Sequence, residues 1–308
     1  LSSSPVSSSQ SIPWYYTSAN DTVECTVTPD DGWVQGAPGV VSEAITFDLW
    51  PHVALGRYHS CVLQYDSSYS CWGRNSEGQL ASSQINLYGQ LTAGELFSCA
   101  LVFGTTTVDC WGDNSANQLS IPNSPFVQIE AGTEHVCGLI FNGTVECWGS
   151  ADFWTSTPPT QRSIEVTSGD EFSCALLETG DIECWNTSLT ASPGPWVQIS
   201  AGRDHLCAVN IAGDIECWGD DSYGQSSPPP NVQFNTVSAG WNHTCGVEMG
   251  TGIAYCWGDN SAGQLSGIPS GFFETVEASW NHSCGHRASG VVECWGCGAG
   301  TDQGQCAP

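Results

Sequence analysis

Short segments in which apolar and polar residues alternate recur along the chain, and small or turn-forming residues separate them. One type of segment ends in small residues, as in FVQIEAG (126–132) and WVQISAG (196–202). A second type carries a cysteine, as in HVCGLI (135–140), and a third ends in Cys-Trp-Gly, as in TVECWG (144–149). A period of two with many β-branched residues is typical of strands, and no helical period accompanies it. The chain is therefore predicted to be all-β.

The three segments recur in a fixed order, and a Cys-Trp pair marks the third one each time. Turn formers such as Asn142-Gly143 stand between the second and third segments, which predicts a hairpin. The Cys-Trp pairs begin at positions 71, 110, 147, 184, 217, 256 and 294. A period in this range indicates repeats that bury each other's faces. We expect a seven-bladed β-propeller over residues 49–308, preceded by an extra strand and lead-in at 21–48 and by a Ser-rich arm at 1–20.

Most of the 17 cysteines fall into local pairs, one pair in each repeat. Each pair would join the second and third strands of one blade, which predicts one local disulfide per blade and an oxidising compartment. Zinc is the competing explanation, but the pairs lack the C-x-x-C spacing of zinc sites. The predicted pairs are Cys61 with Cys71, Cys99 with Cys110, Cys137 with Cys147, Cys174 with Cys184, Cys207 with Cys217, Cys245 with Cys256, and Cys284 with Cys294.

The tryptophan after each second cysteine is predicted to pack between blades. The segment that follows it, D-N-S-x-G-Q-L, is predicted to be a turn that carries the chain to the next blade, with Asp and Asn capping the backbone and Gly supplying a positive φ. This turn is clear at 74–80, 113–119, 220–226 and 259–265. It is altered after Trp148 and Trp185, so one sector of the rim is expected to differ.

Composition restricts the partners. The chain has 32 acidic residues and five basic ones, with a formal net charge of −27. A surface of this kind repels phosphate, so we expect no nucleic-acid partner. No run of 18 apolar residues is present, so no membrane insertion is expected. The first residues, LSSSPVSSSQS, do not have the form of a signal peptide, and a signal is inferred to have been removed.

Five N-x-S/T sequons also favour a secreted glycoprotein that carries N-linked glycans. They are Asn20, Asn142, Asn186, Asn242 and Asn281.

The combined pattern A-G-x-x-H-x-C followed by C-W-G-x-N-x-x-G-Q-L resembles the repeats of the regulator of chromosome condensation superfamily, which includes β-lactamase-inhibitor protein II. The resemblance covers roughly residues 49 to 296, and the cysteine-bearing form is most similar to extracellular crinkly-type repeats. It implies a seven-bladed propeller. It does not transfer a function, because the charge and the expected disulfides disfavour chromatin binding and no kinase segment is present.

Two sets of repeated polar residues are candidate metal-binding or catalytic sites. His59, His135, His205, His243 and His282 share one repeat position, which could form a ring of metal ligands. Phe97 and Phe172 take that position in two repeats, so packed structural histidines are favoured. The acids before the second cysteine (Asp109, Glu146, Glu183, Glu216 and Glu293) are interpreted as solvated positions. No catalytic motif is present, so the protein is predicted to be no enzyme and to hold no cofactor or metal.

The chain ends carry further candidates. Cys297 and Cys306 are predicted to clamp a terminal turn, which leaves Cys25 unpaired or intermolecular. Cys25 lies in NDTVECTV, which resembles a third strand of a repeat and is predicted to pair beside the last blade, or alternatively to join a neighbouring molecule. Trp14, Tyr15 and Tyr16 would form an aromatic assembly arm.

These features predict a secreted, non-enzymatic structural or adhesive building block of an extracellular assembly. Its partners would be proteins, foremost copies of itself, and it could associate into a filament through the N-terminal arm. The alternative is a soluble module that binds a protein or glycan on one rim, with Trp241 and Trp280 as candidate contacts.

Overall fold

The structure, a computed structural model, describes residues 52–64, 66–81, 86–150, 157–298 and 302–307, and the backbone of 22–27 and 39–44. The chain divides into two units, residues 1–48 and 49–308. In the first unit, β1 (Thr22–Val27) pairs with β2 (Gly39–Ala44) in an antiparallel two-stranded sheet. The second unit contains seven three-stranded sheets, each from one repeat, as the sequence predicts.

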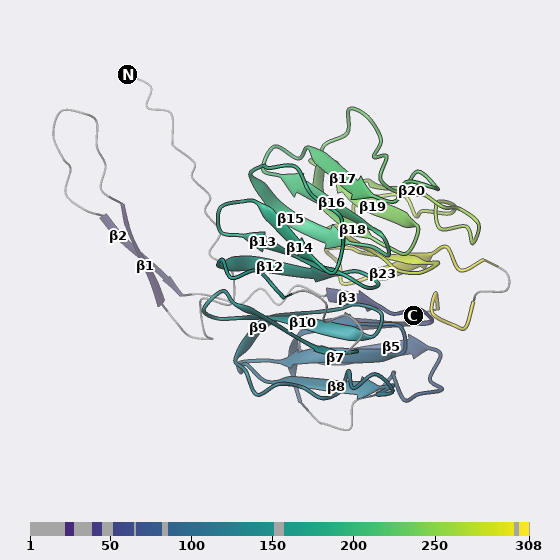
Figure 1. The fold of residues 1–308 in the computed structure, drawn as a ribbon. Helices are drawn as coiled ribbons and strands as arrows, with labels where there is room; N and C mark the ends of the chain where they lie inside the picture. The colour runs from purple at the N-terminus through teal and green to yellow at the C-terminus, as the bar shows by residue number, and fades with distance from the viewer. Residues whose placement is uncertain are drawn as a thin grey trace, which may run out of the picture. The chain divides into compact units, whose positions relative to one another are not determined.

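Each sheet is a blade whose three strands follow one another in chain order and pair antiparallel (Figure 1). The first strands are β3 (His52–Leu55), β6 (Tyr88–Ala93), β9 (Phe126–Ala131), β12 (Ser163–Ser168), β15 (Trp196–Ala201), β18 (Phe234–Ala239) and β21 (Thr275–Ala278). The second strands are β4 (His59–Leu63), β7 (Phe97–Val102), β10 (His135–Ile140), β13 (Ser173–Leu177), β16 (His205–Asn210), β19 (His243–Glu248) and β22 (Ser283–His286). The third strands are β5 (Tyr69–Gly73), β8 (Val108–Gly112), β11 (Val145–Gly149), β14 (Ile182–Trp185), β17 (Ile215–Gly219), β20 (Ala254–Gly258) and β23 (Val292–Trp295).

The core lies between blades. Trp148 of the third blade, for example, packs with Phe126 of its own blade at a ring distance of 5.2 Å and joins a cluster that includes Cys99 and Leu101 of the second blade. Small sheets cannot bury their faces alone, so Trp148 and the first cysteine of each pair become buried where the neighbouring blade packs against them. The prediction that these tryptophans pack between blades is confirmed for Trp148.

Where the G-Q-L phrase or its N-Q-L form is kept, the turn that leaves a blade is tied to the tryptophan of the next blade. Trp111 Nε1 donates a hydrogen bond of 2.9 Å to the carbonyl of Gln79, and Trp148 Nε1 donates one of 3.0 Å to that of Gln118. The Gln118 side chain folds back and accepts the N–H of Ala116. The glutamine of the G-Q-L phrase therefore holds its own turn with its side chain and the next blade with its carbonyl.

At one of the two altered turns this tie is missing. Trp218 would meet the turn that follows Trp185, but its Nε1 donates to the Oε1 of Glu216 in its own strand. Trp196 packs edge-on against Trp218 at a ring distance of 5.3 Å. This sector therefore differs from the others, because Trp218 lacks the hydrogen bond to a turn carbonyl and is held by its packing against Trp196.

The strand that carries Cys25 pairs within the first unit. The sequence predicts that this strand pairs beside the last blade, but β1 pairs with β2, and Cys25 stands opposite Val41. Among the described residues, the sheet of the last blade is formed by β21, β22 and β23. Segment 39–44 supplies a closer partner than a strand more than 200 residues away, because closing a long loop costs more chain entropy.

The last blade meets the first through side chains and through the terminal turn. Ser279 Oγ donates to the carbonyl of Gly56 at 2.6 Å. The carbonyl of Gln305 accepts Trp72 Nε1 at 2.7 Å, as the glutamine carbonyls of the internal turns accept theirs. Residues 302–306 therefore act as the seventh interblade turn and link the last blade to the first.

Candidate functional site: the central channel and its two faces

The seven first strands line a central cavity of about 350 Å³. The edge of each first strand that faces the channel would have unpaired backbone N–H and C=O groups, because no further strand pairs with that edge. Side chains from the neighbouring blade fill this need. The Gln90 side chain accepts the N–H of Ile129 and donates to the carbonyl of the same residue, both at 3.0 Å. Gln128 does the same for Val166, and Gln198 for Val237.

Hydroxyl groups form a second set of links along the channel. Thr92 Oγ1 accepts the N–H of Ala131 at 2.9 Å, and Thr167 Oγ1 accepts that of Ala201 at 2.9 Å. Ser200 and Ser238 repeat the contact in the next two blades. The polar lining of the channel is therefore largely occupied by contacts between blades.

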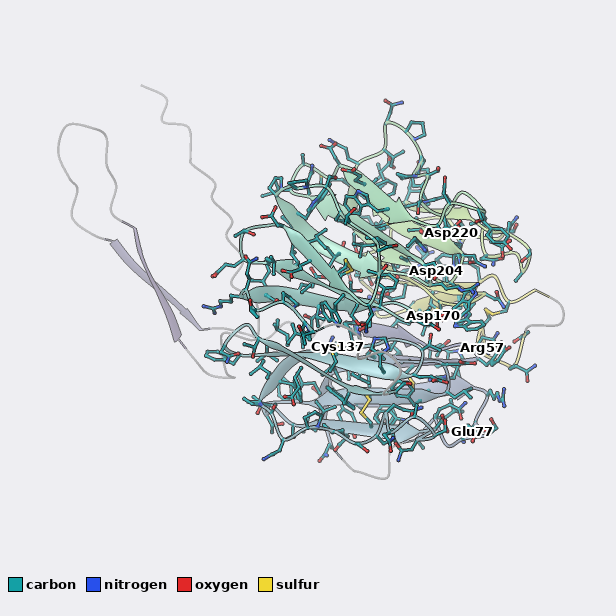
Figure 2. The ribbon with its side chains drawn as sticks, viewed as in Figure 1. Arg57, Glu77, Cys137, Asp170, Asp204 and Asp220 are labelled. Atoms are coloured by element: carbon teal, nitrogen blue, oxygen red, sulfur yellow. A yellow bond between two sulfur atoms is a disulfide. The ribbon has the colours of Figure 1, made fainter. Side chains whose placement is uncertain are left out.

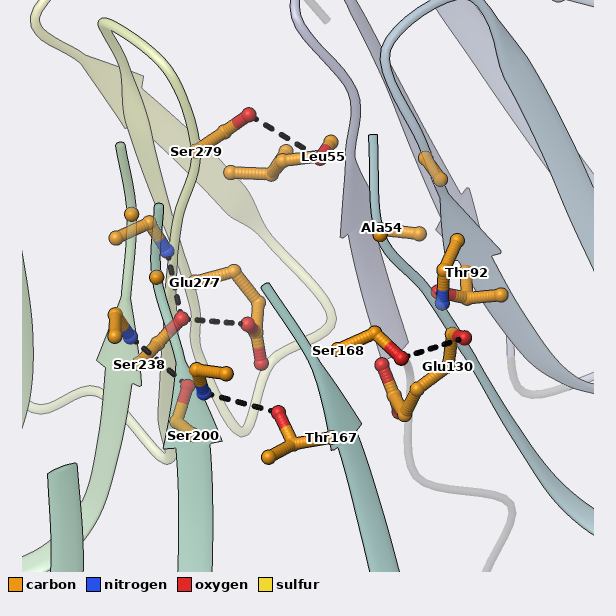
Figure 3. A pocket seen from close by; sticks show the side chains of 18 of the residues that line it. Ala54, Leu55, Thr92, Glu130, Thr167, Ser168, Ser200, Ser238, Glu277 and Ser279 are labelled. Atoms are coloured by element: carbon orange, nitrogen blue, oxygen red, sulfur yellow. Dashed lines mark hydrogen bonds between the residues drawn. The ribbon is translucent and has the colours of Figure 1, made fainter. Parts of the chain in front are cut away.

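Three glutamates of the first strands, Glu130, Glu165 and Glu277, face the same cavity, and Figure 3 shows Glu130 and Glu277 on opposite sides of it. Burial raises the pKa of Glu165 to about 8 and the pKa of Glu277 to about 7. Burial, and then the negative charges of Glu277 and Glu165, hold the pKa of Glu130 well above its usual value. Removal of a carboxylate from bulk water favours its neutral form, so the channel retains protons near neutral pH.

A ring of seven side chains, one from each blade, surrounds the end of the channel at which the first strands end. We call this end the mouth face and the set the mouth ring. Its members are Arg57, Glu95, Thr133, Asp170, Arg203, Trp241 and Trp280. Figure 2 shows Arg57 and Asp170 on this side of the propeller, together with Asp204 and Asp220.

Contacts run around the mouth ring without a break. Arg57 forms an ion pair with Glu95, and the backbone N–H of Glu95 donates to the carbonyl of Thr133 at 3.2 Å. Thr133 Oγ1 donates to Asp170 at 2.6 Å, and Asp170 lies 3.8 Å from Arg203.

The other half of the mouth ring is a stack of four layers. The guanidinium of Arg203 lies 4.7 Å from the ring centre of Trp241, which stacks on Trp280 with ring centres 3.4 Å apart. Arg57 covers the other face of Trp280 at 3.7 Å. Both faces of the two indoles are thus covered, so neither offers a free platform to a sugar ring. The proposed contacts Trp241 and Trp280 are instead part of the blade-to-blade packing.

The five repeated histidines lie buried between blades, each bonded through Nε2 to a hydroxyl of the next blade. His59 contacts Ser98 at 2.9 Å and His205 contacts Thr244 Oγ1 at 2.8 Å. The Ser98 hydroxyl donates to the carbonyl of Gln79, so it must accept from His59, whose Nε2 therefore carries the proton. Burial lowers the pKa of His59, His135 and His205 to about 4 and that of His243 and His282 to about 3.

The two phenylalanines at this position face apolar residues in place of hydroxyls. Phe97 shares a core cluster with Val136, and Phe172 shares one with Leu206. In the sequence, these are the residues that follow the His or Phe position of the next repeat. A hydroxyl thus follows in the next repeat wherever the joint has a histidine, and an apolar residue follows wherever it has a phenylalanine.

The two histidines outside the repeat position also have partners. His52 Nε2 lies 2.8 Å from the carbonyl of Leu91, in the place that glutamine takes in other blades. His286 Nδ1 lies 3.5 Å from Glu274. Within the described ranges, no group of three His, Cys, Asp or Glu residues is arranged to hold a metal ion.

The acids before the second cysteines are not uniformly solvated. Asp109 accepts hydrogen bonds from Asn86 and from the hydroxyl of Tyr88, and Glu293 forms an ion pair with Arg287. Glu216 accepts the Trp218 indole N–H. The chain therefore uses some of these positions to hold side chains near the outer strands.

The seven blade disulfides are present as predicted, each between directly opposed residues of the second and third strands with Cα atoms 4.0–4.1 Å apart. The structure also joins Cys297 to Cys306, with Cα atoms 6.1 Å apart. These eight bonds take sixteen cysteines and leave Cys25, in β1, without a partner among them.

Four sequons lie in the described part of the propeller. Asn142 is exposed in a hairpin turn, and its Oδ1 accepts the N–H and hydroxyl of Thr144. Asn242 and Asn281 follow the two mouth-ring tryptophans, and Asn186 follows Trp185. Asn20 and the arm residues Trp14, Tyr15 and Tyr16 lie outside the described residues.

Comparisons with known proteins agree with this geometry. The family model for the regulator of chromosome condensation (RCC1) repeat matches residues 196–225 and 234–264. The CRINKLY ectodomain of the receptor kinase ACR4 from Arabidopsis thaliana is similar at a TM-score of 0.68 and 25% identity, over 80% of this chain and 95% of that one.

Two further structures share the fold. The entire ectodomain of the receptor kinase CR4 from Physcomitrella patens matches at a TM-score of 0.66 and 24% identity, over 80% of this chain and 72% of that one. Prp20p from Saccharomyces cerevisiae matches at 0.61 and 19% identity, over 74% and 80%. The bonded cysteines and the ectodomain neighbours fit an extracellular module. No helix in the described residues is long and apolar enough to span a bilayer. With its seven sheets and repeated interblade phrase, the chain is similar in fold to RCC1-repeat proteins, and two of its seven repeats match the family model.

Proposed function

We propose that this protein is an extracellular module that acts by binding another protein and catalyses no reaction. The observation that carries the proposal is the disulfide in every blade. Such bonds form and persist in oxidising compartments. The similarity to the Arabidopsis receptor ectodomain, at 25% identity over most of both chains, supports the same location.

The use of the polar residues supports binding over catalysis. The repeated histidines bond to hydroxyls across blade joints, and the glutamines of the channel cap the edges of neighbouring strands. A catalytic base needs access to a substrate proton. Side chains that hold blades together at buried joints lack that access, so a rigid disc that presents its faces to a partner is the better use of this architecture.

The proposal is tested by secretion and by disulfide mapping. The full chain, expressed behind a secretory leader, is expected in the medium with the eight bonds intact in non-reduced peptide digests. A mass shift on glycan removal, lost in part in Asn142→Gln, would support the predicted glycosylation. Free thiols at the blade cysteines would contradict an extracellular role.

A second candidate is an extracellular building block that joins copies of itself. Cys25 favours it, because the other sixteen cysteines of this sequence are bonded to one another, which leaves Cys25 available for a disulfide with a second copy. Sedimentation of the full chain with and without reductant, beside Cys25→Ser and a deletion of residues 1–20, tests this candidate. A monomer under all conditions would refute it.

A further inference from the structure

Exposed apolar side chains are concentrated on the side of the propeller opposite the mouth face. We call it the turn face, because the hairpin turns between second and third strands lie there. Among the residues that the structure describes, the large exposed apolar side chains on this side include Ile211, Met249, Ile253, Phe272 and Val291. We call these five the turn-face arc. Scattered exposed apolar residues are normal, but a contiguous set indicates an interaction site.

The turn-face arc is contiguous across the fifth, sixth and seventh blades. A Cβ added to Gly213, in the turn that begins with Ile211, would lie 2.8 Å from Met249 Cε. A Cβ added to Gly252, beside Ile253, would lie 2.3 Å from the ring of Phe272. Arg287, in the turn that contains Val291, donates to the Phe272 carbonyl at 3.2 Å. The hairpin turn of the fifth blade therefore lies against that of the sixth. The turns of the sixth and seventh blades both contact the segment that leads into the seventh blade.

Charge around the turn-face arc selects the kind of partner. Asp214 and Glu216 are exposed beside it, and Glu248 ends the strand before Met249. The guanidinium of Arg287 is already paired with Glu293. A second copy would bring the same carboxylates and another formal charge of −27, and an anionic membrane would also be repelled. A cationic surface with apolar anchors is the complementary partner.

The described sequons do not obstruct this surface. Asn242 and Asn281 lie on the mouth face, beside Trp241 and Trp280. Asn142 is on the turn face but in the third blade, and Asn186 follows the last strand of the fourth. Glycans at these four positions would leave the fifth to seventh blades accessible from the turn face.

We propose that the turn-face arc is the docking surface for a basic segment of another extracellular protein, in which large apolar side chains stand among lysines or arginines. The proposal rests on the proposed binding function and specifies its surface and the chemistry of its partner. The apolar side chains of that segment would cover Phe272 and Ile211, and its cations would meet Asp214 and Glu216.

The test uses the full chain and a synthetic peptide of alternating lysine and leucine, with fluorescence anisotropy as the readout. Phe272→Ser is the main variant and Phe141→Ser its matched control, because these rings are 54% and 56% exposed and only Phe272 belongs to the arc. Phe272→Ser and Ile211→Ser are expected to weaken binding about fivefold or more, the effect of losing an anchor of at least 1 kcal/mol. Phe141→Ser should leave binding unchanged. A lysine–serine and a glutamate–leucine peptide should bind weakly.

Three results would overturn the proposal. Equal binding by Phe272→Ser and Phe141→Ser would mean that the peptide binds through the net charge of the protein alone. Equally tight binding of the glutamate–leucine peptide would remove the electrostatic argument. A wild-type dimer in sedimentation that Phe272→Ser dissociates would assign the arc to a second copy. Free thiols in the disulfide mapping would be a separate outcome. They would refute the extracellular location, but the peptide binding of the variants could still be compared.

Discussion

His282 Nε2 lies 3.0 Å from Ser60 Oγ, and this buried contact joins the last blade to the first across 222 positions of the chain. The Ser60 hydroxyl also donates to the carbonyl of Gln305 at 2.9 Å, so His282 must supply the proton in the first bond. Gln305 in turn belongs to the terminal turn that Cys297 and Cys306 clamp. Closure of the propeller therefore depends on this terminal turn and its disulfide.

Replacement of Cys297 and Cys306 by serine should loosen this joint. Opening a loop of this size is expected to lower the free energy of unfolding by roughly 2–3 kcal/mol. Hydrogen exchange should rise in the first and last blades, because Ser60 and Trp72 share the Gln305 carbonyl. The double variant of Cys174 and Cys184 is the control, since its loop is similar but its effect should stay near the fourth blade. Unchanged protection in the first and last blades would contradict the closing role.

The two kinds of blade joint predict a specific rescue. His205→Phe would remove the donor to the Thr244 hydroxyl, which would keep only its bond to the Gln225 carbonyl, and Thr244→Val would leave the buried His205 N–H without an acceptor. Each single change should cost about 1–3 kcal/mol in unfolding free energy. The double variant reproduces the Phe97 and Val136 joint, so it should recover part of that loss. Chemical denaturation of the four proteins measures the coupling, and strictly additive losses would show that the two side chains do not act as a pair.

The sequence predicted the blades, the disulfides and the packed tryptophans because these features repeat at fixed positions. The mouth ring was not predicted, because five different residue types occupy its one repeat position and they become complementary only after the ring closes. The channel glutamates were also not predicted as a group, because Glu130, Glu165 and Glu277 stand at two different positions along their strands. The histidine joints did leave a signal in the sequence. Ser98 and Thr244 stand directly after the His or Phe position in the repeats that follow those of His59 and His205, whereas Val136 takes this place in the repeat that follows that of Phe97.

Stability should have a maximum near pH 6–7. Burial holds the pKa of His59, His135 and His205 near 4, below the ordinary value of 6.5. The unfolded chain therefore binds more protons than the folded one as pH falls from 6.5 to 4, so stability decreases in that range. His243 and His282, with pKa values of about 3, add to the loss.

Below pH 6.5 the three channel carboxyls make stability fall as the pH rises, whereas the five histidines make it rise. The histidines are more numerous, so their effect is the larger one in this range. Above pH 6.5 the carboxyls act alone and lower stability as the pH rises. Thermal unfolding followed from pH 4 to 9 should therefore give a bell-shaped curve. In the His205→Phe, Thr244→Val double variant the acid limb should be less steep, and an equally steep limb would exclude His205 as a contributor.

Glu165→Gln should stabilise the protein, and more so at alkaline pH. Gln90, Gln128 and Gln198 take the equivalent place in three other blades and bond to both backbone groups of the next strand, whereas Glu165 accepts only the Ile199 N–H, at 3.5 Å. Its pKa of about 8 means that the folded protein retains a proton which the unfolded chain releases above pH 4.5.

Stability that depends on Glu165 is therefore full below pH 4.5 and is lost as the pH rises through 8, by up to about 1.4 kcal/mol for each pH unit. Glutamine does not titrate, so the difference in unfolding free energy between Glu165→Gln and the wild type should grow from pH 5 to pH 9. Glu183→Gln, on an exposed outer strand, is the control and should show a constant difference. Parallel curves for both variants would mean that Glu165 is ionised throughout, with solvent reaching it freely through the channel.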